Sequence, residues 1–265
     1  MEAHLERLRP PAVAGSFYPA EPDRLQALVR QYLARVPGGG RPPKAVIVPH
    51  AGFAYSGPVA AFAYARLALA RAWVRRVVLL GPCHRVAFRG LAVSAASGFA
   101  TPLGVVDNDP DGVWAALSLP AVRRDEAPHQ REHSLEVQLP FLQTVLGSFK
   151  LVPVVVGDAE PEEVDALLEH LWGGEETAVV VSSDLSHYLE AGAARVRDAA
   201  TAAAIRDLEP QRLDPDAACG AIPVRGLLLT ARRRGLACEI LDVRSSGDTA
   251  GDRDRVVGYG AFAFA

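Results

Sequence analysis

Three of the seven histidines come within six residues after apolar runs of the kind that form buried strands. They are His50 after KAVIV (44–48), His84 after RVVLL (76–80) and His187 after TAVVV (177–181). Ligands of open α/β sheets bind outside the carboxyl ends of parallel strands, so we expect these side chains to converge on one site. Imidazole is the commonest metal ligand, and two imidazoles with one anionic group form an open site. The spacing therefore predicts a metal site at one edge of a sheet.

Each of these histidines also allows another interpretation. Taken alone, His50 or His84 equally fits a buried histidine that is hydrogen-bonded to backbone. His187 also fits an acid–base role or the orientation of a metal ligand, because Asp184 stands three residues earlier and can hold its ring on a turn. The serine-rich stretch 182–186 around Asp184 fits a structural loop just as well.

A fourth histidine lies in the segment REHSLEVQLP (131–140). If this segment is helical, His133 and Glu136 are three residues apart and project the same way, a geometry used for metal ligation and for proton transfer. An ordinary helix that begins at an N-capping Ser134 explains the same residues. We therefore place His133 among the catalytic candidates, with Asp184 and His187.

The cysteines differ in their surroundings. Cys219 precedes Gly220 and Pro223 between two helical patterns, where the positive potential of a helix start would stabilise a thiolate as ligand or nucleophile. Cys238, within the apolar run ACEIL, fits the core. Cys83 directly precedes His84, and adjacent residues seldom point to the same metal, so we leave it outside the ligand set. Three cysteines in a chain of 265 residues do not form a disulfide framework.

Apolar runs and helical patterns alternate along the chain. Four segments are apolar at every position, which is typical of strands covered on both faces: 44–48, 76–80, 151–156 and 177–181. Helical patterns lie at 22–36, 59–70, 134–146, 161–172, 193–208 and 224–234. This order predicts an α/β fold with a mostly parallel central sheet flanked by helices.

The remaining segments complete this arrangement. Residues 238–243 and 256–264 are expected to form two strands that pair antiparallel at a sheet edge, and 91–94 is a weaker strand candidate. The stretch PGGGRPP (37–43) predicts a loop between the first helix and the first buried strand. We interpret the whole chain, 1–265, as a single domain.

Composition excludes several classes of protein. The chain has 28 Lys and Arg against 31 Asp and Glu, a net charge of −3, and it lacks the basic patch of a nucleic-acid binder. No apolar run approaches the ~20 residues that span a bilayer, and the N-terminal residues lack the apolar segment of a secretory signal. We therefore expect a cytoplasmic protein with no membrane or nucleic-acid partner.

Taken together, the motifs resemble those of the Memo family, of the prokaryotic type called AmmeMemoRadiSam system protein B. The resemblance covers nearly the whole chain and rests on ordered blocks: RPPAVAGSFYP (9–19), PHAGFAYSGPVAA (49–61), LLGPCHR (79–85), EHSLEVQLPFL (132–142), SSDLSHY (182–188), ACGAIPV (218–224) and VVGYGAFAF (256–264). It implies an α/β fold similar to class III extradiol dioxygenases, which bind non-haem iron with two histidines and a carboxylate.

The resemblance also implies a ligand set. In Memo proteins a cysteine replaces the carboxylate, which maps iron or copper onto His50, His84 and Cys219, with Asp184 and His187 as further pocket residues. Cys83 and Arg85 depart from the family, which often has serine before and histidine after this ligand. Prokaryotic members accompany AMMECR-type and radical-SAM proteins, which suggests a shared pathway.

Three functions fit these features. The preferred one is a metal-binding, redox-related protein, a metal-dependent oxidoreductase if it is an enzyme, since thiolate with imidazole suits Cu(+), Fe(2+) or Zn(2+). The second is a ring-cleaving dioxygenase acting on a small aromatic, with His133 or His187 moving protons. The third is a module whose pocket holds a peptide or partner protein without turnover. The sequence leaves the roles of Cys83 and Glu136 open, and also whether the chain forms a homo-oligomer.

Overall fold

A computed structural model describes residues 8–265, and its centre is a nine-stranded mixed sheet. The strands run in the order β10-β12-β2-β9-β3-β8-β4-β7, and β11 pairs with β12. They are β2 (Ala45–Val48), β3 (Arg76–Pro82), β4 (Leu91–Val93), β7 (Val122–Arg124), β8 (Lys150–Val156), β9 (Thr177–Ser182), β10 (His187–Leu189), β11 (Cys238–Ser245) and β12 (Val256–Phe264). A smaller sheet joins β1 (Leu8–Arg9), β5 (Gly98–Thr101) and β6 (Gly104–Asp107).

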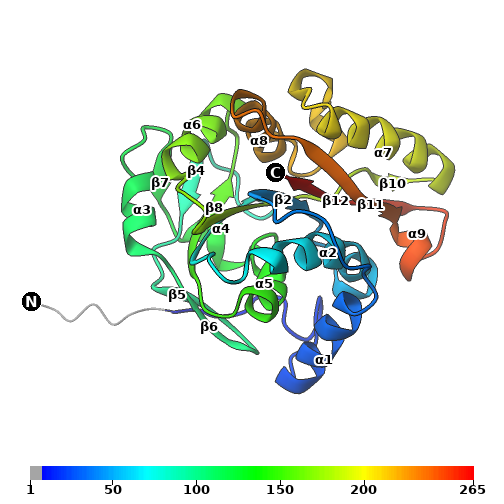
Figure 1. Cartoon of the computed structure of the whole chain (residues 1–265), viewed down its shortest axis with the longest axis horizontal. Helices are drawn as coiled ribbons and strands as arrows, with labels where there is room; N and C mark the ends of the chain where they lie inside the picture. Colours follow the sequence, from blue (N-terminus) through cyan, green and yellow to red (C-terminus); the bar gives the residue numbers. More distant parts are fainter. Residues whose placement is uncertain (1–7) are drawn as a thin grey trace, which may run out of the picture.

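Helices cover both faces of the large sheet. They are α1 (Pro22–Leu33), α2 (Phe53–Leu67), α3 (Pro110–Ala116), α4 (Ala127–Gln130), α5 (Leu139–Leu146), α6 (Pro161–Leu171), α7 (Ala191–Arg206), α8 (Ala221–Arg233) and α9 (Ser246–Thr249). Figure 1 shows α1, α2 and α5 on one side of the sheet and α6, α7 and α8 on the other.

The core follows directly from the alternation of side chains along each central strand. In β2, Val46 and Val48 belong to the cluster with α1, α2 and α5, while Ala45 and Ile47 belong to the cluster with α6, α7 and α8. All four side chains are fully buried. Burial of a valine or isoleucine side chain stabilises the fold by about 1.5–3 kcal/mol relative to exposure. A strand with helices on both faces of its sheet must be apolar at every position, which is why the sequence of β2 does not alternate between polar and apolar residues.

The expected α/β architecture is confirmed, including all four central strands and their parallel pairing. β2 pairs parallel with β9, and β3 lies parallel between β9 and β8. The sheet is mixed at its edges, since β4 runs antiparallel to β8 and β12 runs antiparallel to β2. The expected antiparallel pairing of the two C-terminal strands, β11 and β12, is also confirmed.

Two predicted helix starts are wrong. The helix expected from residue 59 begins at Phe53, because Pro58 is accommodated inside α2 instead of ending it. A proline in this position removes one backbone donor, and the burial of Phe53 and Val59 on either side outweighs that loss. The helix expected from Ser134 begins as a 3-10 turn at Glu136–Gln138 and becomes α-helical only from Leu139.

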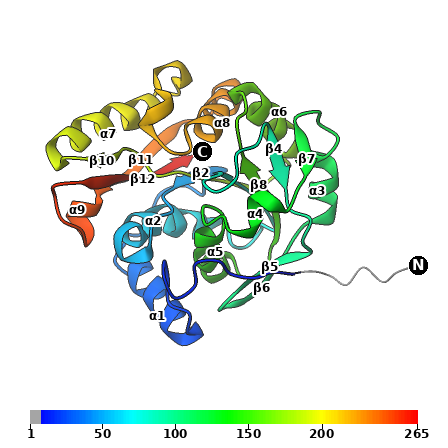
Figure 2. The ribbon, with the colours of Figure 1, turned by 180° about the vertical axis from the view of Figure 1, so that it is seen from behind.

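The N-terminal segment closes over the face that carries α5. Figure 2 shows it leaving β1 beside β5 and passing α5 on the way to α1. Among residues 8–265, no helix combines the length and the hydropathy that crossing a bilayer requires.

Candidate metal centre

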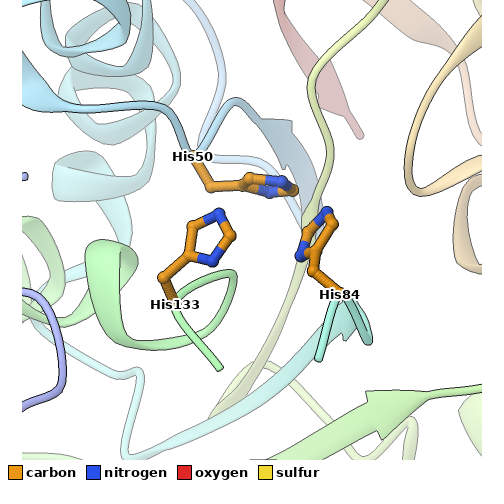
Figure 3. A group of neighbouring side chains, drawn as sticks. All are labelled: His50, His84 and His133. Carbon is orange, nitrogen blue, oxygen red and sulfur yellow. The ribbon is translucent and has the colours of Figure 1, made fainter. Parts of the chain in front are cut away.

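Three histidines from separate parts of the chain meet at the carboxyl end of the central strands. His50 follows β2, His84 follows β3, and His133 lies in the turn between α4 and the 3-10 segment Glu136–Gln138. Each contributes one ring nitrogen to a group whose members all lie within 4.8 Å of one another. Figure 3 shows the three rings facing a common space. This group could hold a metal ion.

The ring of His50 is fixed by a serine at the end of β9. Its Nδ1 lies 2.8 Å from Ser182 Oγ. That hydroxyl donates its only proton to the Ser134 carbonyl (2.6 Å) and accepts from Gln138 Nε2 (2.8 Å). Nδ1 of His50 must therefore be the donor, which leaves the lone pair on Nε2 free for a metal. Burial, with the neighbouring histidines, also lowers the pKa of His50 well below 6.5, so the ring is neutral at pH 7.

One buried carboxylate holds the other two histidines. Glu132 Oε1 accepts a hydrogen bond from His84 Nδ1 at 2.9 Å. The same oxygen lies 3.2 Å from His133 Nδ1, but that contact does not have the geometry of a hydrogen bond. The two Glu132 oxygens also accept the backbone N–H groups of His84, His133 and Ser134. Burial alone would raise the pKa of Glu132, but the neighbouring His133 and His84, with the His84 backbone N–H, hold it far below its usual range. An ionised carboxylate can only accept, so His84 carries its proton on Nδ1 and presents Nε2.

Cys219 lies beside His50. Its Sγ is 3.2 Å from His50 Nε2 and accepts the Asp184 N–H at 3.3 Å. Gly220 permits this approach, because a Cβ there would lie 2.8 Å from the Ser183 side chain. The expectation that a helix start would stabilise the Cys219 thiolate is wrong for the protein without metal. Burial raises the pKa of the Cys219 thiol, and the nearby Asp184 charge raises it further.

The other expected site residues surround this group. Asp184 is buried, accepts the His50 N–H at 2.7 Å, and has a pKa raised by its burial. His187 begins β10 and lines a cavity of about 380 Å³, in whose wall Cys219 also lies. Cys219, predicted as a metal ligand, and His187 both lie outside the compact group of three, whereas His133, which the sequence assigned to proton transfer, belongs to it.

The expectation that His133 and Glu136 project the same way is wrong. Residues 134 and 135 do not continue a helix, because Ser134 Oγ donates to the Pro82 carbonyl at 2.8 Å and ties the turn to the end of β3. Glu136 points instead toward the N-terminal segment, where it accepts from Arg9 and Tyr18. Sequence reasoning missed Glu132, whose only signal is its position next to His133.

A protein-family comparison decides the classification. The model of the family described as Memo-like protein matches residues 9–263. The chain belongs to the Memo family. It is 37% identical to a MEMO1 family protein of Aquifex aeolicus over 264 residues, which cover 96% of this chain and 97% of the relative. Memo family proteins of Ignicoccus hospitalis and Sulfolobus acidocaldarius are 36% and 35% identical, with at least 95% of each chain covered. The Memo family is related to the extradiol dioxygenase fold, as the sequence resemblance implied.

Proposed function

We propose that this Memo family chain is a redox-related protein that binds iron(II) or copper(I) through His50, His84 and Cys219, with His133 as a further donor. The observation that carries the proposal is the set of imidazoles held by Ser182 and Glu132 next to a partly buried thiol. A separation of 3.2 Å between Sγ and Nε2 suits two donors of one ion, given metal–ligand bonds of about 2.0–2.3 Å.

The types of donor favour these metals over others. Thiolate and imidazole select copper, iron or zinc and disfavour magnesium and calcium, which prefer oxygen. Zinc fits the donors too, but it has no redox chemistry. When bound, iron or copper supplies one-electron chemistry, while the chain's own residues orient the ligands and exclude water. Glu132 fixes two rings, Ser182 fixes the third, and Asp184 holds the backbone of His50.

The thiol also separates this proposal from ring cleavage of a small aromatic. Extradiol chemistry uses a carboxylate as its anionic ligand, and here that position corresponds by resemblance to Cys219. A thiolate in the presence of oxygen oxidises to sulfenic acid and beyond, so it is poorly suited to repeated oxygenation. A shared pathway with AMMECR-type and radical-SAM proteins, and a peptide or partner in the pocket without turnover, stay predictions.

Cobalt(II) substitution tests the proposed ligand set directly. The metal-free protein loaded with cobalt(II) should show intense visible bands of a low-coordinate site and a near-ultraviolet thiolate-to-cobalt charge-transfer band. Cys219→Ser should abolish the charge-transfer band and keep cobalt bound, because the histidines remain. Cys238→Ser, which removes a thiol far along the sheet, is the matched control and should keep the band. A wild-type spectrum without this band, or a band that depends on Cys238, would contradict the assignment.

Glu132→Gln should weaken metal binding about 10–100-fold while the three histidines remain, because loss of the ionised acceptor frees the rings of His84 and His133. The measurement is competition against a chromogenic chelator. Glu175→Gln, at an exposed position, is the control and should leave the affinity unchanged. Equal affinity in wild type and Glu132→Gln would show that Glu132 does not orient the ligands.

A further inference from the structure

A second cavity opens beside the metal centre. Its volume is about 450 Å³, and its wall includes Cys219 and Cys83. It lies between the loop before α6 and the first turn of α8, and its apolar lining includes Val86, Phe88 and Ile222. A space of this size holds a small organic molecule.

The described lining residues include one basic side chain, which is only partly buried. Arg225 stands on α8 one turn after Ile222, and both residues line the cavity. Its Nε is buried without a hydrogen-bond acceptor among residues 8–265. Near the end of the same helix, by contrast, Arg233 pairs with Asp165 and Arg234 pairs with Glu169.

An unpaired buried donor of this kind is costly. A buried polar group without a partner destabilises a fold by about 1–3 kcal/mol, more if it is charged. Folded proteins therefore satisfy nearly all such groups, and an unsatisfied one next to a cavity points to a ligand atom. The matching ligand for guanidinium is a planar anion, because its N–H groups form a fork that fits two oxygens.

We propose that this cavity binds a small organic carboxylate, with Arg225 holding the carboxylate and the apolar body lying against Val86, Phe88 and Ile222. The far end of the ligand then reaches the wall formed by Cys219, beside the metal centre. As the substrate class of that centre, this assignment rests on the proposed function, although the binding itself requires no metal.

The rim of the cavity favours a carboxylate over a phosphate ester. Asp158 and Glu160 line it and are exposed, so they repel an anion that enters. The repulsion is roughly twice as large for a dianion as for a monoanion, since it scales with the ligand's charge. A monoanion with an apolar body is therefore favoured, because it is attracted by Arg225 and repelled less by the two rim carboxylates than a dianion is.

The test is titration of the metal-free full-length protein with benzoate, benzamide and phenyl phosphate, followed by calorimetry or ligand-observed NMR. We expect benzoate to bind more tightly than either analogue. Arg225→Met should weaken benzoate binding at least about tenfold, or about 1.4 kcal/mol. Arg225→Lys should retain part of the affinity, because it keeps the charge without the fork. Arg232→Met removes an exposed charge from the same helix and should leave binding unchanged.

Several results would overturn the assignment: no benzoate binding by wild type at millimolar concentration, equal binding by Arg225→Met, or tighter binding of phenyl phosphate. Circular dichroism of each variant verifies that the fold is kept, and the Arg225→Lys variant supplies the answer if Arg225→Met is unstable. Because the titration uses metal-free protein, Arg225-dependent binding of benzoate stands even if the metal proposal fails. In the same way, metal binding by the histidines stands even if benzoate does not bind.

Discussion

Replacement of both His50 and His84 by alanine should reduce the metal content of anaerobically purified protein from about one ion per chain to background. The two rings contribute two of the three clustered nitrogens and come from rigid strand ends, so neighbouring side chains cannot replace them. His133 and Cys219 alone would leave too few donors for tight binding. The measurement is elemental analysis of wild type and variant purified in parallel.

His170→Ala is the control for this experiment, since His170 is a histidine on α6 far from the cluster in sequence. It should keep the metal content of wild type. Circular dichroism establishes that the double variant is folded. Equal metal content in the wild type and a folded His50→Ala, His84→Ala variant would refute the assignment of these residues as ligands.

Glu136→Gln should lower the free energy of unfolding by about 3–5 kcal/mol, because it leaves a buried guanidinium without its counter-charge. Glu136 is fully buried and accepts from Arg9 (2.5 Å) and the Tyr18 hydroxyl (2.6 Å). It also accepts the backbone N–H groups of Ala12 (2.7 Å) and Val13 (3.0 Å). Glutamine keeps the shape but presents an NH₂ group to donors. Urea denaturation followed by circular dichroism measures the change.

A second ion pair provides the comparison. Glu239→Gln breaks the pair with Arg66, in which the Glu239 side chain is 58% exposed, and should cost no more than about 1 kcal/mol. Arg9→Met combined with Glu136→Leu should recover part of the loss, because it removes both buried charges. A Glu136→Gln variant no less stable than Glu239→Gln would show that the buried network does not stabilise the N-terminal segment.

The strand ends were predictable from the sequence because parallel strands impose a simple rule on position. Runs that are apolar at every residue mark buried strands, and their carboxyl ends meet at one edge, so the sequence alone places His50 and His84 together. The resemblance to the Memo family added Cys219 from the far end of the chain. Neither argument depends on details of the loops.

The remaining part of the site depends on contacts that local patterns do not encode. The turn at His133 is set by the bond from Ser134 to the end of β3, so the interpretation of this segment as a helix misplaced Glu136. The role of Glu132 arises from three backbone donors and two rings that only the fold assembles. The raised pKa of Cys219 likewise reflects burial, which a helix-start argument does not include.

The wide spacing of the clustered residues along the chain has a consequence for biosynthesis. His50 and Cys219, now 3.2 Å apart, are separated by 169 residues. A zinc finger gathers its ligands from a short segment, so the ion can nucleate folding while the chain is still emerging. Here the thiol leaves the ribosome only after the three clustered histidines and most of the sheet have been synthesised. Such long-range closure is slow, so the proposed ligand set including Cys219 is complete only in a chain whose sheet is nearly finished.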